Sequence, residues 1–210
     1  MAILKRTGGV LFLGAAIAGV IGLSAAPAVA ATWTVKPGGP TTATSGKATL
    51  TDTRSGVSLS CASSKGAATL KSGSGLSGTG IGSITSLAFT SCTGPGGLMF
   101  TVTNSHFPWS LNAVSFNSTT GVTAGTITGI HSTLTGPSCS AVVDGTGATA
   151  DNGMVSATYT NSTGALKVLT TGGNLHIYSV SGCFGLIRSG DPATFSATYT
   201  VSPKQAITSP

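Results

Sequence analysis

Apolar and polar residues alternate with a period of two along much of the chain after residue 30. The clearest run is 193–201, where alanine, phenylalanine, tyrosine and valine alternate with serine and threonine. Shorter runs of this kind occupy 57–61, 98–103 and 155–160. Because successive side chains of a strand point to opposite faces, this period predicts strands with one buried face. After residue 30 we find no convincing amphipathic helix, so the pattern predicts an all-β protein.

Turn residues separate these runs at short, regular intervals. Glycine, proline and asparagine cluster at 94–97, 151–153 and 161–164, among other places. Such spacing is typical of antiparallel strands joined by tight turns. We therefore expect ten to twelve short strands arranged as an antiparallel sandwich or a barrel-like sheet.

The first thirty residues have the three parts of a secretory signal peptide. Lys5 and Arg6 precede an apolar stretch over 10–23, and Ala28-Val29-Ala30 provides small residues for cleavage before Ala31. The apolar stretch is too short for a spanning helix, which needs roughly twenty residues. The sequence thus predicts a signal peptide over 1–30, a linker-like N-terminal segment over 31–47, an all-β domain over 48–201 and a flexible tail over 202–210. No later segment predicts a membrane span.

Four cysteines lie in the predicted exported part, at Cys61, Cys92, Cys139 and Cys183. An even number of cysteines in an exported chain predicts disulfides, whereas a zinc site would need close pairs that are absent here. Three pairings are open, and we favour the sequential one, Cys61–Cys92 with Cys139–Cys183. A weak repeat of the motif 82–87 at 125–130 suggests two related halves, each with one disulfide.

The charged residues argue against nucleic-acid binding. Eight lysine and arginine residues and four aspartates follow residue 30, a net charge of +4, and glutamate is absent. The basic residues are scattered singly, whereas nucleic-acid binding needs a basic patch or stripe. The sheet surface should instead be rich in threonine and serine hydroxyls and nearly uncharged.

The sequence shows no recognisable arrangement of catalytic side chains. His106, His131 and His176 have no metal-ligand spacing, and we expect each of them on a polar face or in a loop. Asp144 and Asp151 stand in sequences typical of turns. A Ser–His–Asp triad stays open, because geometry rather than sequence order defines it. We therefore predict no catalytic residue, no metal site and no cofactor.

Two aromatic residues are candidates for ligand binding. Trp109 follows Phe107-Pro108 and opens a strand-like run in phase with Leu111, which favours a place in the core. If its ring projected from the loop, it could stack on a sugar or anchor a partner. Tyr178, opposite in phase to Ile177, is the second candidate.

The cysteine layout and the stretches 126–131, 136–139 and 190–195 together resemble a group of small secreted four-cysteine β proteins of actinobacteria. The resemblance covers most of the chain after residue 30. It implies an extracellular location, and it implies nothing about site residues.

These features favour a secreted or cell-envelope protein with a structural or binding role rather than an enzyme. Its expected partners are a cell-wall polymer or another secreted protein. Two alternatives remain: a secreted hydrolase whose site is assembled by the fold, and a membrane β-barrel. The latter is less favoured because its strands need an outward apolar band of about ten residues.

Overall fold

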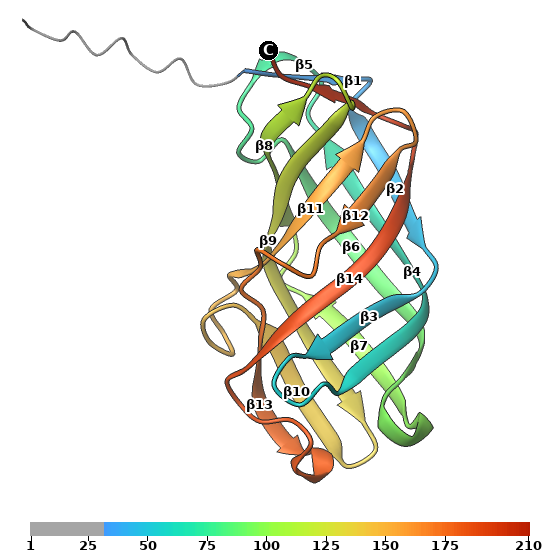
Figure 1. Ribbon diagram of the computed structural model, residues 1–210, viewed down its shortest axis with the longest axis vertical. Helices are drawn as coiled ribbons and strands as arrows, with labels where there is room; N and C mark the ends of the chain where they lie inside the picture. Colours follow the sequence, from blue (N-terminus) through green and yellow to red (C-terminus); the bar gives the residue numbers. More distant parts are fainter. Residues whose placement is uncertain (1–31) are drawn as a thin grey trace, which may run out of the picture. The chain divides into compact units, whose positions relative to one another are not determined.

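The computed structural model describes residues 32–210, so the predicted signal peptide lies outside the described residues. The described chain is almost entirely β, as the alternation predicted, although it has fifteen strands rather than ten to twelve (Figure 1). No helix among the described residues is long and apolar enough to cross a membrane. In chain order the elements are β1 (Trp33–Lys36), β2 (Gly39–Ser45), β3 (Ala48–Asp52), β4 (Ser58–Leu70), β5 (Gly73–Leu76), β6 (Gly82–Thr93), η1 (Pro95–Gly97), β7 (Met99–Ser105), β8 (Trp109–Asn117), β9 (Val122–Gly136), β10 (Cys139–Asp144), β11 (Gly153–Thr160), β12 (Ala165–Val168), β13 (His176–Gly182), η2 (Cys183–Gly185), β14 (Asp191–Ser202) and β15 (Ala206–Thr208).

Twelve strands form one antiparallel sheet that closes on itself, which decides between the sandwich and the barrel. The long strands β4, β6, β9 and β14 each hold one position of the ring. The other four positions are each shared by two short strands: β2 with β3, β8 with β7, β11 with β10, and β12 with β13. The first strand of each couple lies in the upper half of Figure 1 and the second in the lower half. Each half is therefore an eight-stranded barrel. The strand count exceeds the predicted ten to twelve partly because two short strands share each of four ring positions.

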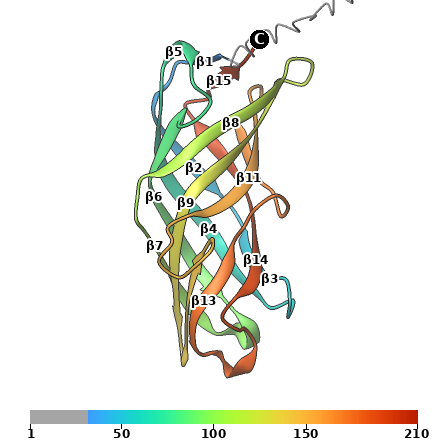
Figure 2. The same ribbon diagram turned by 90° about the vertical axis from the view of Figure 1, so that its left-hand side faces the viewer.

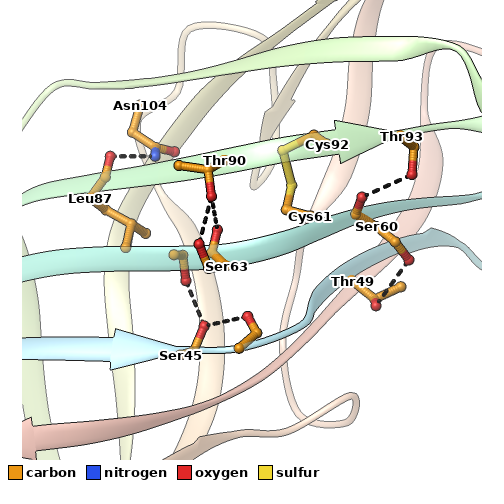
Figure 3. The surroundings of a disulfide bond; sticks show 12 residues. Ser45, Thr49, Ser60, Cys61, Ser63, Leu87, Thr90, Cys92, Thr93 and Asn104 are labelled. Atoms are coloured by element: carbon orange, nitrogen blue, oxygen red, sulfur yellow. Dashed lines mark hydrogen bonds between the residues drawn. A yellow bond between two sulfur atoms is a disulfide. The ribbon is translucent and has the colours of Figure 1, made fainter.

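The strand faces follow the period-two prediction. On β11, Val155, Ala157 and Tyr159 are buried, and on β14 Ala197 and Tyr199 are buried. The outward faces carry hydroxyl groups that pair across strands (Figure 3): Ser63 Oγ lies 2.6 Å from Thr90 Oγ1. Cross-strand pairs of this kind contribute roughly 0.2–1 kcal/mol each.

Both disulfides have the predicted sequential pairing. Cys61 on β4 is bonded to Cys92, its cross-strand partner on β6 (Figure 3). Cys139 on β10 is bonded to Cys183 in η2. Cys61 is buried on the same side as Leu59, as the alternation predicted. The two predicted halves do not fold apart, because β14 pairs with β2 and β3 within one sheet.

Two segments that the sequence indicated as linker and tail form strands instead. Residues 39–45 form β2, which pairs with β4 and β14, and residues 206–208 form β15, which pairs with β1. Gln205 and Ile207 are buried. The apolar–polar alternation that predicts strands is weak in both segments. The inward positions of β2 include Thr41 and Ser45 rather than large apolar residues, and β15 has only three residues.

Candidate functional site

An apolar cavity of about 180 Å³ lies inside the barrel. Its wall includes the side chains of Leu87, Phe89, Trp109, Ile127 and Phe195, which reach it from four different strands. An eight-stranded barrel has an interior just wide enough to be filled by side chains or to hold one small ligand. Small residues at several wall positions leave this interior partly open.

Polar side chains at the cavity wall already have protein partners. Asn104 Nδ2 donates to the Leu87 carbonyl at 2.8 Å, and Ser132 Oγ donates to Asn104 Oδ1 at 2.6 Å. Tyr199 Oη accepts a hydrogen bond from Ser64 Oγ at 3.0 Å, and burial raises the pKa of the Tyr199 hydroxyl. With these groups paired and uncharged, the cavity suits an apolar ligand.

A three-stranded sheet covers the upper end of the barrel. In this sheet β1 pairs with β15 and β5, and Figures 1 and 2 both place these strands at the upper end. Trp33, Val35 and Ile207 form an apolar cluster with barrel residues there. Gly78 permits the close packing, because a Cβ at that position would lie 2.6 Å from Trp33 Nε1. The upper end is therefore closed by packed side chains.

The lower end of the barrel has an exposed apolar surface. The three side chains that form it, here called the apolar rim, are Leu98, Phe184 and Leu186, which line one cavity and are 38–73% exposed. Phe184 is the most exposed of them, and its backbone has the left-handed φ of 53°. Exposed apolar side chains that are gathered in one place mark binding surfaces more often than isolated ones do.

A second cavity of about 80 Å³ lies behind the rim, between η1 and η2. Leu50, Leu59 and Leu134 line both this cavity and the interior one, so these three side chains lie at the boundary between the two. Asp52 also lines the second cavity, and its Oδ2 is buried without a hydrogen-bond partner in the described chain.

The two predicted ligand-binding aromatics lie in different surroundings. Trp109 is 3% exposed, stacks on Phe107 and donates from Nε1 to the Ser105 carbonyl at 3.0 Å, so it lies in the core and lines the interior cavity. Tyr178 does not line that cavity, and its hydroxyl donates to the Gly145 carbonyl at 3.2 Å. Binding of a cell-wall polymer or a secreted protein through Tyr178 stays a prediction.

His106 lies in a loop, as expected, whereas His131 differs from expectation. His131 is buried rather than placed on a polar face, and its ring stacks on that of His106 with the centroids 4.4 Å apart. His131 Nδ1 lies 3.0 Å from Asp144 Oδ2. Burial raises the pKa of the Asp144 carboxyl, but hydrogen bonds from the Gly145 N–H and His131 outweigh it and hold this pKa below its ordinary value. Sequence spacing could not reveal this group, because strand register assembles it.

The hydrolase alternative requires a serine beside a histidine. In residues 32–210 no serine hydroxyl is hydrogen-bonded to a histidine ring: the rings of His106 and His131 contact aspartates, and that of His176 contacts backbone carbonyls. Among the described residues, none of the histidines is therefore paired with a serine in the way that nucleophilic catalysis uses.

Comparison with known proteins gives a family for this chain. Residues 5–209 match the model of a family described as alkane oxidation protein activator PraA/PraB-like. The chain belongs to this PraA/PraB-like family. No curated protein and no solved structure matches it. The match spans the barrel, both disulfides and the capping sheet, so every described feature of this PraA/PraB-like chain falls within the family region.

Proposed function

We propose that this protein binds hydrocarbon chains and acts as a non-enzymatic carrier that supplies them for oxidation. The apolar interior cavity is the observation that carries the proposal, since its polar neighbours already have protein partners. The family description, alkane oxidation protein activator, supports the same ligand class. A carrier would activate oxidation by holding a poorly soluble substrate in solution.

The size of the cavity indicates the length of chain that fits. An apolar cavity of about 150 Å³ holds benzene, so about 180 Å³ suits a hydrocarbon of about seven carbons. Burial of roughly seven carbons at about 0.8 kcal/mol each sets an upper bound of about 5.6 kcal/mol, or a Kd on the order of 0.1 mM. Longer chains would need the second cavity as well.

The apolar rim supplies the route by which the hydrocarbon enters. Phe184, Leu98 and Leu186 line the second cavity and are exposed, so a chain leaving a hydrocarbon surface would meet them first. Movement of the three shared leucines would then join the second cavity to the interior one. The covered upper end leaves the lower end as the entrance in this proposal.

An extracellular or cell-envelope location forms part of the proposal. Two disulfides and no free cysteine among the described residues favour an oxidising compartment. The expected signal peptide agrees with export. Expression in a secreting host should yield protein outside the cytoplasm that begins at Ala31, as N-terminal sequencing would show; retention of residues 1–30 in the cytoplasm would contradict this location.

Headspace gas chromatography over protein solutions tests hydrocarbon binding directly. Untagged protein at about 1 mM is equilibrated with limiting n-hexane or benzene vapour, and the hydrocarbon withdrawn from the gas phase is measured. We expect saturable uptake of about one molecule per chain. Ala157→Leu, which fills part of the cavity, should reduce uptake by at least about fivefold.

The matched control is Ala88→Leu, the same change at an exposed position of β6. It should bind hexane as the wild type does. Absence of saturable uptake by the wild type would refute the proposal, as would equal uptake by wild type and Ala157→Leu, because the hydrocarbon would then lie outside the cavity.

A further inference from the structure

A histidine–aspartate cluster lies apart from the cavity, where short strands meet the long strand β9. His131 is part of β9, and its register partner is Ser105, the last residue of β7. His106 follows directly in the β7–β8 connection, and Asp151 lies in the β10–β11 connection. The two connections occupy ring positions on opposite sides of β9, so they bring His106 and Asp151 to His131 from both sides.

Three potential metal ligands converge in this cluster. The ligand atoms of His106, His131 and Asp151 all lie within 4.8 Å of one another. His106 Nδ1 is hydrogen-bonded to Asp151 Oδ1, and His131 Nδ1 lies 3.2 Å from the same oxygen. Asp144 Oδ2 lies 3.0 Å from His131 Nδ1 on the buried side. Two imidazoles and a carboxylate are therefore held together before any ion binds.

The buried Asp144 carboxylate fixes the loop that carries Asp151. It is fully buried and accepts hydrogen bonds from four backbone N–H groups, with N···O distances of 2.6–3.1 Å. The donors are Gly145, Asp151, Asn152 and Gly153. Asp144 Oδ2 also contacts His131 Nδ1 and so fixes the orientation of that ring. Because a ligating histidine donates its other ring nitrogen to such a carboxylate, His131 Nε2 is the nitrogen left to bind an ion. Asp144 thus positions two members of the cluster at once.

The backbone at two of the ligands is held in an uncommon conformation. His106 has φ of 57° and Asp151 has φ of 51°, both in the left-handed region. Such conformations persist only where surrounding contacts impose them, and they concentrate at functional sites. Here they aim both side chains at His131, although each side chain is about half exposed.

The charges of the cluster also favour a cation. Within the described chain, Asp144 and Asp151 form ion pairs only with His106 and His131, and neither pairs with a lysine or arginine. With neutral imidazoles, the two carboxylates carry a charge of −2. A divalent ion would balance this charge.

We propose that His106, His131 and Asp151 bind one divalent transition-metal ion of the zinc or copper class, with Asp144 as the positioning residue. Imidazole nitrogen with carboxylate oxygen is a donor set typical of Zn²⁺ and Cu²⁺, whereas Ca²⁺ and Mg²⁺ prefer oxygen alone. The half-exposed side leaves a position for water or another ligand. Because the ion connects the β7–β8 and β10–β11 loops through β9, its binding should also stabilise the fold.

Isothermal titration calorimetry on untagged, chelator-treated protein tests this site. Zn²⁺ and Cu²⁺ are titrated separately, and Ca²⁺ serves as the comparison ion. We expect one Zn²⁺ or Cu²⁺ per chain with a micromolar or lower Kd, a higher Tm with the ion bound, and no binding of Ca²⁺ at the same concentrations.

Two variants remove ligands while keeping the fold. His106→Gln changes a half-exposed side chain, and Asp151→Asn keeps a residue that tolerates the left-handed conformation. Loss of a group that merely orients a ligand weakens metal binding about 10–100-fold, so each variant should weaken it by at least about 100-fold. Their Tm values without metal should stay near that of the wild type.

His176→Gln is the control, because it removes the histidine outside the cluster and keeps a donor for the Gly145 carbonyl. It should bind Zn²⁺ as the wild type does. Absence of stoichiometric binding by the wild type would overturn the proposal. So would equal weakening in His106→Gln, Asp151→Asn and His176→Gln, which would indicate nonspecific binding to histidines.

Discussion

Filling the interior cavity from Ala157 offers a direct test of whether the barrel is open inside. Ala157 is 5% exposed, lies on β11 between the inward residues Val155 and Tyr159, and forms part of the cavity wall. Its register partners are Gly125 on β9 and Val168 on β12. A leucine at this position would extend into the cavity.

The size and sign of the effect follow from the cavity volume. At about 24 cal/mol per Å³, a cavity of about 180 Å³ costs about 4 kcal/mol. Leucine adds three carbons, which stabilise by about 0.8 kcal/mol each when buried, and loses about 0.5–1 kcal/mol of side-chain entropy. We expect Ala157→Leu to raise the free energy of unfolding by about 1.5 kcal/mol. In a filled core the same change would cost about 1–3 kcal/mol through overpacking.

Urea unfolding followed by circular dichroism, with the disulfides intact, measures this difference. For an m value of about 2 kcal/mol/M, the midpoint should rise by about 0.7 M in Ala157→Leu. Ala88→Leu, an exposed position, should stay within about 0.5 kcal/mol of the wild type. A fall of more than about 1 kcal/mol in Ala157→Leu with an unchanged control would refute the open cavity and remove the basis for hydrocarbon binding.

Three further predictions concern the Cys139–Cys183 disulfide, the stability of the fold at low pH and the apolar rim. Replacing Cys139 and Cys183 together by alanine should destabilise the protein by about 4 kcal/mol in urea unfolding, since their disulfide spans 44 residues; a loss below about 1 kcal/mol would contradict this estimate. The hydrogen bonds from Arg54 lower the pKa of Asp191 to about 2, so the stability that this carboxylate contributes is complete above about pH 4 and is lost as the pH falls through 2. Arg54→Ala should therefore move the midpoint of acid unfolding to higher pH in a circular dichroism titration. An unchanged midpoint would argue against this linkage. Phe184→Asn, which tolerates the left-handed φ, should reduce adsorption to hexadecane droplets without lowering Tm, whereas unchanged adsorption would exclude Phe184 from the entrance.

Local pattern in the sequence predicted much of the fold. The alternation over 193–201 and 155–160 gave the inward faces of β14 and β11, because a half-buried strand shows its period wherever large apolar residues alternate with hydroxyls. The same reasoning failed at residues 39–45, where Thr41 and Ser45 point inward and hydrogen-bond within the protein. Closure of the sheet depends on the pairing of β14 with β2, which no local pattern encodes.

The two candidate sites were out of reach of sequence reasoning for a related reason. The cavity depends on which small residues meet across the barrel, and Ala157 looks like any other alanine in a chain rich in alanine. The phase of Trp109 with Leu111 correctly predicts its place in the core, but the space beside its ring depends on the opposite wall. Asp151 lies in the β10–β11 loop, although no turn forms at the Asp-Asn-Gly sequence that predicted one, and the loop brings its carboxylate to two histidines.

The division of ring positions into short strands accounts for the location of the histidine–aspartate cluster. Where β8 takes over from β7 and β11 takes over from β10, a connection leaves the wall on each side of β9. The long strand must adjust to the change of partners, and it does so at Gly129, which has φ of 85° beside a shift in register with β11. A barrel of eight uninterrupted strands would have loops only at its ends. The interruption therefore creates loops at mid-height, where they bring His106 and Asp151 over His131 and leave the lower end free for the apolar rim.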